Sequence, residues 1–190
     1  MPNSKLLIID FYDSFTYNLQ HYFASILQVV DVVYFDKIQE IDMNGYDLFV
    51  LSPGPGLPKQ KHGIKNIIGS IMSQKKPLLG VCLGFQALAE ILGAELKNQD
   101  KVKHGVSETI RVVDSNSILF QGIPKTFKVG LYHSWKVDSK DNLQVTAISE
   151  NNITMAFEDA DKKLFGIQFH PESILTENGL KILQNFCQFK

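Results

Sequence analysis

Leu78-Leu79-Gly80-Val81-Cys82-Leu83-Gly84-Phe85-Gln86 is the stretch of sequence that indicates the fold most directly. Its apolar run 78–81 is typical of a buried strand. The run leads into Gly-x-Cys-x-Gly, and a helical pattern follows at once, as in the strand–turn–helix elbow that presents a nucleophile. Glycines on both sides of Cys82 would let the backbone turn sharply, and the helix N-terminus would stabilise a thiolate there. We therefore interpret Cys82 as a nucleophile.

Strand and helix patterns alternate around this stretch. Apolar and β-branched runs predict strands at 5–10, 29–35, 47–51 and 77–81. Helical spacing predicts helices at 15–27, 63–72 and 86–92, the first capped by Asp13 or Ser14 and the last ended by Gly93. Strands that alternate with helices favour a mostly parallel, doubly wound α/β sheet with right-handed connections.

The pattern changes at about Ala94. Strand-like segments joined by short turns follow at 108–113, 126–135, 143–149, 153–159 and 163–169, with 158–163 as a hairpin connection. They should add an antiparallel portion to the sheet or form a smaller sheet beside it. Thr176 is expected to cap a final helix over 177–189. No repeat or linker divides the sequence, so we expect one domain over residues 1–190.

Composition and charge limit the possible partners. The chain has 190 residues, 44% of them hydrophobic and 21% charged, as in an ordinary globular protein. Its formal net charge of −1 gives no electrostatic reason to expect nucleic acid or an anionic membrane. No apolar stretch approaches the roughly 20 residues that span a bilayer, and the amino terminus lacks the layout of a signal peptide. We expect a cytoplasmic protein with reduced thiols.

A nucleophilic cysteine needs a base and a group that orients the base. Among the five histidines, only His170 lies in a segment of the required shape, because a strand at 164–169 runs into His170-Pro171-Glu172-Ser173. Residues i and i+2 of an extended chain point the same way, so His170 and Glu172 can lie side by side. A carboxylate beside an imidazole fixes its tautomer and stabilises the imidazolium. We interpret Cys82, His170 and Glu172 as a catalytic set.

The remaining cysteine and histidines have simpler interpretations. Cys187 lies on the apolar side of the terminal helix and is expected to fill the core, as most free cysteines do. His21 lies on a helix face, and His62 and His104 lie in polar surroundings. No histidine stands at metal-ligand spacing from a cysteine or carboxylate, so we expect no metal site.

Three separated motifs occur together: Ser52-Pro53-Gly54-Pro55-Gly56, the Cys82 elbow, and Gln168-Phe169-His170-Pro171-Glu172-Ser173. With them the sequence resembles the class I (triad) glutamine amidotransferases, over essentially its whole length. The glutaminase components of anthranilate synthase and of 4-amino-4-deoxychorismate synthase are the most similar branch. The resemblance implies a flavodoxin-like three-layer fold with helices on both faces of the sheet, and it implies no cofactor.

The resemblance also implies roles for individual residues. Cys82 would attack the side-chain amide of glutamine to form a γ-glutamyl thioester, with His170 as base and then acid and Glu172 orienting it. Main-chain N–H groups of Gly56 and Leu83 would form the oxyanion hole.

Further positions would bind the substrate or a partner. The rest of the loop around Gly56, namely Gly54 and Pro55, would line the glutamine site, and Gln86, Ser134 and Trp135 would contact glutamine. Trp135 stands where many relatives have leucine. His104-Gly105 resembles a family loop at the partner interface.

The partner implied is a separate chorismate-binding synthase subunit that consumes the ammonia. It would be anthranilate synthase component I, in tryptophan biosynthesis, or aminodeoxychorismate synthase component I, in folate biosynthesis, and one glutaminase can serve both. The overall resemblance favours anthranilate synthase. Two other hypotheses are a different cysteine hydrolase on the same fold, such as a γ-glutamyl hydrolase, and a catalytically silent binding subunit.

Overall fold

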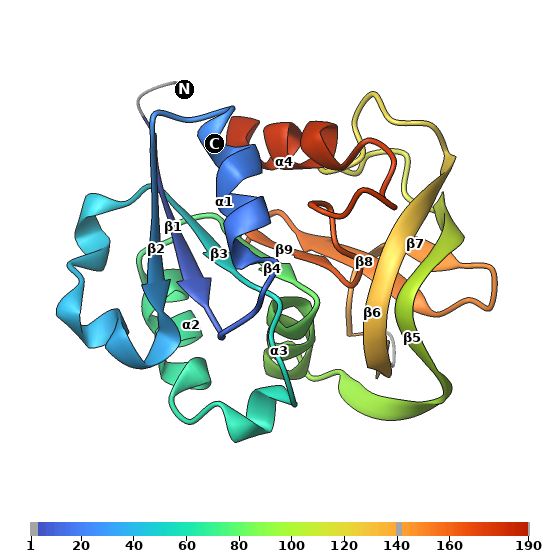
Figure 1. The fold of residues 1–190 in the computed structure, drawn as a ribbon, viewed down its shortest axis with the longest axis horizontal. Coiled ribbons are helices and arrows are strands. Elements are labelled where there is room, and N and C mark those ends of the chain that lie inside the picture. Colours follow the sequence, from blue (N-terminus) through green and yellow to red (C-terminus); the bar gives the residue numbers. More distant parts are fainter. Residues whose placement is uncertain (1–3, 140–141, 190) are drawn as a thin grey trace.

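The computed structural model describes residues 4–139 and 142–189. The first residues of the amino terminus, from which no signal peptide was expected, and residue 190, the end of the expected domain, lie outside these ranges. Among the described residues, nine strands form one sheet in the order β2-β1-β3-β4-β9-β8-β7-β5-β6 (Figure 1). The strands are β1 (Lys5–Asp10), β2 (Val29–Tyr34), β3 (Leu48–Leu51), β4 (Leu78–Val81), β5 (Glu95–Val112), β6 (Thr126–Asp138), β7 (Val145–Ser149), β8 (Thr154–Asp159) and β9 (Leu164–Ile167). The helices are α1 (Thr16–Ala24), α2 (Ile64–Ser73), α3 (Leu83–Ile91) and α4 (Gly179–Gln188), with 3-10 turns η1 (Phe35–Glu40), η2 (Met43–Gly45) and η3 (Pro58–Gln60).

The parallel half of the sheet separates two hydrophobic cores. Strands β2, β1, β3, β4 and β9 all run parallel. Alternate residues of β1 enter opposite cores: Leu6 and Ile8 pack with residues of α1 and α4, whereas Leu7 and Ile9 pack with residues of α2 and α3. Figure 1 shows α1 in front of these strands and α2 behind them. Because both faces are covered, β1, β3, β4 and β9 are apolar almost throughout, whereas the edge strand β2 is only partly buried. The predicted three-layer α/β fold is confirmed.

The second half of the chain extends the same sheet and does not build another. Strand β9 pairs in parallel with β4 and antiparallel with β8, so the last strand of the chain lies next to the strand that precedes Cys82. Strands β7, β5 and β6 continue the sheet in antiparallel pairs. The predicted hairpin between β8 and β9 is present, since the connection joins two adjacent antiparallel strands. No helix among the described residues is both long and apolar enough to cross a bilayer.

Strand β5 is much longer than predicted. Its first part, before residue 108, forms a ribbon with β6 that is interrupted by irregular register between Asn98 and Lys103 and between His104 and Val106. Most side chains of this part are exposed or half-buried. It therefore lacks the apolar alternation by which a strand is recognised in a sequence.

The helix starts also differ from the predictions. Helix α3 begins at Leu83, directly after Cys82, and not at Gln86. Helix α1 has Phe15 as its N-cap, although Asp13 still accepts the N–H of Phe15 at 2.8 Å. The prediction that Thr176 caps the last helix was wrong, because α4 starts after Asn178 and has no side-chain cap.

Candidate functional site

The predicted site residues gather at the carboxyl ends of the parallel strands, where open α/β sheets bind ligands. Cys82 directly follows β4, and Ser52, which begins the glycine-rich loop, directly follows β3. His170 lies just beyond β9, the neighbour of β4. The topology therefore brings the three separated motifs of the sequence to one edge of the sheet.

Cys82 occupies a sharp elbow between β4 and α3. Its φ of 52° and ψ of −99° are unfavourable for an L-residue, a strain that typically costs about 1–3 kcal/mol. Its N–H donates to the carbonyl of Ile167 at 2.9 Å, which fixes the elbow to β9. The Cys82 side chain is buried at the N-terminal end of α3, where the first N–H groups of the helix have no partner within it.

Two glycines allow this elbow to form. A Cβ atom on Gly80 would lie 2.4 Å from the main-chain carbon of Gly84. A Cβ atom on Gly84 would lie 2.5 Å from the main-chain oxygen of Leu51. Both distances are far below van der Waals contact, so a side chain at either position would push α3 away from the strands and displace Cys82.

His170 and Glu172 form a buried pair. Nδ1 of His170 lies 2.7 Å from Oε1 of Glu172, and both residues are at most 4% exposed. Nε2 of His170 is buried without a hydrogen-bond partner among the described residues, which leaves it for Cys82. Burial alone would lower the pKa of His170, but its interactions with the Cys82 sulfur and the Glu172 carboxylate outweigh burial and raise the pKa. The arrangement favours a protonated His170 between the Cys82 sulfur and the Glu172 carboxylate.

The position of His170 is fixed by its backbone and by two rings. Its N–H donates to the carbonyl of Gly130 on β6 at 3.1 Å. The hydroxyl of Thr176 donates to the His170 carbonyl at 2.5 Å and accepts the N–H of Gly130 at 2.9 Å. The rings of Phe15 and Tyr132 lie 5.4 and 4.8 Å from the imidazole, both edge-on. Thr176, for which the sequence predicted a helix cap, instead ties β6 to the His170 segment.

The glycine-rich loop lies against the start of α3. The Ser52 hydroxyl accepts the N–H of Phe11 at 2.9 Å, which anchors the loop to the end of β1. A Cβ atom on Gly54 would lie 2.8 Å from the side chain of Leu83, so loop and helix are in contact. Pro55 and Gly56 are exposed, and Gly56 has a φ of +82° that favours glycine.

Gln86 lies in a buried network that also contains Gln168. Nε2 of Gln86 donates to Oε1 of Gln168 at 3.1 Å and to the main-chain carbonyl of Trp135 at 3.4 Å. Nε2 of Gln168 in turn donates to Cys82 Sγ at 3.6 Å. No role was predicted for Gln168, although it lies in the motif that contains His170. Its spacing could have indicated one, because it precedes His170 by two residues and alternation places both side chains on one side of an extended chain.

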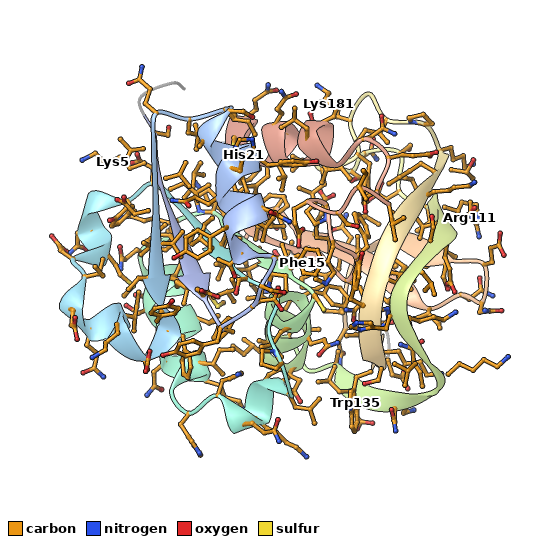
Figure 2. The ribbon with its side chains drawn as sticks, viewed as in Figure 1. Lys5, Phe15, His21, Arg111, Trp135 and Lys181 are labelled. Carbon is orange, nitrogen blue, oxygen red and sulfur yellow. The ribbon has the colours of Figure 1, made fainter. Side chains whose placement is uncertain are left out.

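Ser134 and Trp135 lie half-buried near the end of β6, and Figure 2 shows Trp135 at the lower rim of the molecule. It is the carbonyl of Trp135, not its indole, that contacts Gln86. His133, which the sequence did not single out, is buried with its Nδ1 2.7 Å from that same carbonyl. Burial lowers the pKa of His133 to about 4, although the hydrogen bond to Trp135 opposes the shift.

Cys187 and the three remaining histidines take no part in the hydrogen bonds described above. His21, His62 and His104 are exposed, and His104 contacts the edge of the Tyr132 ring at 5.7 Å. Figure 2 labels His21 on α1. Cys187 is buried in the core, as expected, and burial raises its pKa to about 12.

Comparisons with known proteins agree with the motifs. Residues 7–189 match the family model described as Glutamine amidotransferase class-I. Anthranilate synthase component 2 of Saccharolobus solfataricus is 40% identical over 187 residues, covering 95% of this chain and 96% of that protein. Anthranilate synthase component 2 of Lactococcus lactis is 37% identical over 185 residues, covering 95% of this chain and 92% of that protein.

Solved structures share the fold. The crystal structure of a glutamine amidotransferase from Thermotoga maritima aligns with a TM-score of 0.79 at 20% identity, covering 98% of this chain and 97% of that one. The motifs, their position at one edge of the sheet and the family match agree. The chain therefore belongs to the class I glutamine amidotransferase family of enzymes.

Proposed function

We propose that this chain is the glutaminase subunit of an anthranilate synthase. It hydrolyses L-glutamine to glutamate and ammonia and delivers the ammonia to a separate, chorismate-using subunit. The buried His170–Glu172 pair next to the Cys82 elbow carries this proposal, together with the identity to proteins named anthranilate synthase component 2. The family match over 7–189 supports our expectation of one domain.

The first half of the reaction forms a thioester. The Cys82 thiolate attacks the side-chain amide carbon of glutamine, and the amide oxygen becomes an oxyanion. N–H groups of Leu83, at the start of α3, and of Gly56, in the loop that contacts it, stabilise the oxyanion. The His170 imidazolium, held by Glu172, gives its proton to the departing nitrogen, which leaves as ammonia.

The second half restores the enzyme. Neutral His170 takes a proton from water as the oxygen of that water attacks the thioester carbon. The tetrahedral intermediate collapses, the bond to Sγ breaks, and glutamate leaves. The proton on His170 again faces a thiolate, the state that raises the pKa of the imidazole.

Glutamine itself is contacted by Gln86, Ser134 and the main chain at Trp135. Gln86 donates both Nε2 protons within the protein, so its Oε1 is the atom left to accept from glutamine. Because Trp135 contacts Gln86 through its carbonyl and not through its indole, tryptophan in place of the usual leucine is compatible with a main-chain role.

The test uses a glutamine-analogue electrophile with the purified chain, alone and with candidate synthase subunits, and mass spectrometry to find the modified residue. We expect labelling at Cys82 and not at Cys187, faster with anthranilate synthase component I, and none in Cys82→Ala. Anthranilate should form from chorismate and glutamine with the wild-type chain, whereas Cys82→Ala should require added ammonium.

The other outcomes are equally informative. Acceleration by aminodeoxychorismate synthase component I alone would assign the chain to folate biosynthesis, and acceleration by both would indicate a shared subunit. If Cys82 stays unmodified with every partner, the glutaminase proposal fails and the silent-subunit hypothesis replaces it.

A further inference from the structure

A line of buried amides connects β6 to the sulfur of Cys82. Gln168 has no exposed surface and Gln86 is only 4% exposed. Starting from the Trp135 carbonyl, the contacts run to Gln86 at 3.4 Å, on to Gln168 at 3.1 Å, and end at Cys82 Sγ at 3.6 Å. Burying an amide without a hydrogen-bond partner costs free energy, so the pairing of these two side chains stabilises this part of the site.

Only one orientation of the two amides satisfies all of these contacts. The Trp135 carbonyl can only accept, so Gln86 must turn its NH2 group to it. The same NH2 group then meets Gln168, which must present its oxygen. The NH2 group of Gln168 is consequently turned to Cys82 Sγ. Rotating either amide by half a turn would bring two donors or two acceptors together.

The Trp135 carbonyl, which determines the orientation of both amides, also contacts His133. Nδ1 of buried His133 lies 2.7 Å from the Trp135 oxygen. His133 is neutral at physiological pH, because burial lowers its pKa to about 4, so its single proton belongs on Nδ1. Nε2 of Gln99 lies 2.7 Å from the same Nδ1, and with the proton on Nδ1 the Gln99 amide has to turn by half a turn so that its oxygen accepts there. The Trp135 carbonyl thus accepts from both His133 and Gln86, and its orientation is fixed.

We propose that Gln168 is a further catalytic residue of this site: its side-chain N–H stabilises the Cys82 thiolate, and its oxygen fixes Gln86 with Oε1 available to glutamine. The inference rests on the proposed glutaminase function for its second part only. A hydrogen bond to a thiolate is stronger than one to a neutral thiol, because the acceptor is charged. The proton stays on Gln168 throughout, so no bond is made or broken there.

The test measures the rate of Cys82 alkylation by iodoacetamide against pH, by mass spectrometry of the full chain. Gln168→Met keeps the length of the side chain but cannot donate. We expect its alkylation midpoint to move to higher pH by about one unit, the effect of losing one hydrogen bond to a charged acceptor. Gln168→Glu should move it further, because it adds a negative charge beside the thiolate. In both variants kcat/KM for glutamine at neutral pH should fall on the order of tenfold or more.

The chain carries its own control for folding. Cys187 is buried in the core and burial raises its pKa to about 12, so it stays a neutral, unreactive thiol while the protein is folded. Gln184→Met, a change at a half-buried glutamine on α4, should leave the Cys82 profile unchanged. If Gln168→Met exposes Cys187, then Gln168→Asn, which keeps the amide but withdraws it from Sγ, must still show the shift.

Failure of this proposal is distinguishable from failure of the glutaminase proposal. An unchanged Cys82 midpoint in a Gln168 variant with Cys187 protected overturns the role of Gln168 and leaves the glutaminase intact. A shifted midpoint in a chain that has no glutaminase activity with any synthase subunit would retain the thiolate contact and overturn the function proposed for the site.

Discussion

At the scale of single residues, the site works through opposing effects on its histidines. His170 and His133 are both buried, and burial alone lowers the pKa of each. His170 overcomes this effect because Cys82 and Glu172 face it with negative charge, whereas His133 faces a carbonyl and stays neutral. One imidazole is therefore prepared to carry a proton and the other to hold a main-chain group in place.

Replacing Glu172 tests the first of these states. Glu172→Gln keeps the shape but removes the charge that stabilises the imidazolium, so kcat/KM should fall roughly a hundredfold or more. The pKa of His170 should drop, and since the reaction needs the protonated ring, the alkaline limb of the pH profile should move to lower pH. Glu177→Gln is the control, because Glu177 accepts the N–H of Lys128 and lies in the same segment. Equal activity in both variants would remove Glu172 from the mechanism.

His133 predicts a dependence of stability on pH. Below pH 6.5 the unfolded chain takes up a proton at His133, whereas the folded chain does so only near pH 4. The free energy of unfolding should therefore decrease as the pH falls through this window, by up to about 3 kcal/mol from this residue. Urea unfolding of His133→Gln should show a shallower decrease than the wild type, and the exposed-site control His62→Gln should not. Parallel curves for His133→Gln and wild type would contradict the assignment.

Residues differ in how far their roles could be predicted from the sequence. The Cys82 elbow and the adjacent His170 and Glu172 follow from local spacing, because one turn and one extended segment determine them. The roles of Thr176 and His133 could not be predicted, since their partners are carbonyls and N–H groups that only the folded chain brings near. Thr176 was predicted as a helix cap instead.

At the scale of elements, the start of α4 supports the segment that carries His170, the proposed base. A Cβ atom on Gly179 would lie 1.9 Å from the carbonyl oxygen of Pro171, the residue between His170 and Glu172. The first turn of α4 and the catalytic segment are thus packed backbone to backbone. Any movement of one must move the other.

Alanine at Gly179 should therefore damage the site without touching substrate. The clash with the Pro171 backbone forces a shift, and we expect loss of stability by about 1–3 kcal/mol and a lower kcat. The matched change is Gly69→Ala in α2, where a Cβ atom meets nothing within 4 Å. That change should stabilise the protein by about 0.5–1 kcal/mol, as alanine usually does in a helix. Thermal unfolding and glutaminase assays of both variants check this, and a neutral Gly179→Ala would mean that the two segments are not rigidly packed.

Elements were predictable where burial imposes a pattern. The first four parallel strands and the four helices were found because one or both of their faces are buried. The strand at β9 was also found, but it was predicted within the antiparallel portion and its parallel pairing with β4 was not predicted. The first part of β5 was missed because its side chains are largely exposed, and helix starts were misplaced by a few residues because caps depend on distant contacts.

At the scale of the whole molecule, the two segments that carry the proposed catalytic residues share the centre of the sheet. Cys82 follows β4, His170 follows β9, and these strands are adjacent and parallel. Their core side chains are fully buried on both faces. The relative position of Cys82 and His170, the proposed nucleophile and base, therefore depends on the part of the sheet that is hardest to open.

Hydrogen exchange tests this dependence. The N–H of Cys82 donates to Ile167, so its exchange should require opening of the β4–β9 pair and should approach the free energy of global unfolding. Amides at 99–103, in the irregular and largely exposed part of β5, should exchange many times faster. Measuring exchange against low concentrations of denaturant separates local from global opening. Fast exchange at Cys82 would show that the elbow opens locally.

The insertion of β9 between β4 and β8 also has a consequence for the timing of synthesis. A ribosome makes β4 and Cys82 early, and the antiparallel half of the sheet follows before β9 is made. During that interval the chain has no His170, and β4 has no β9 to pair with. The proposed base therefore reaches the proposed nucleophile only after β9 has been made. If both roles hold, a growing chain has no glutaminase activity until the strand that precedes His170 has been translated.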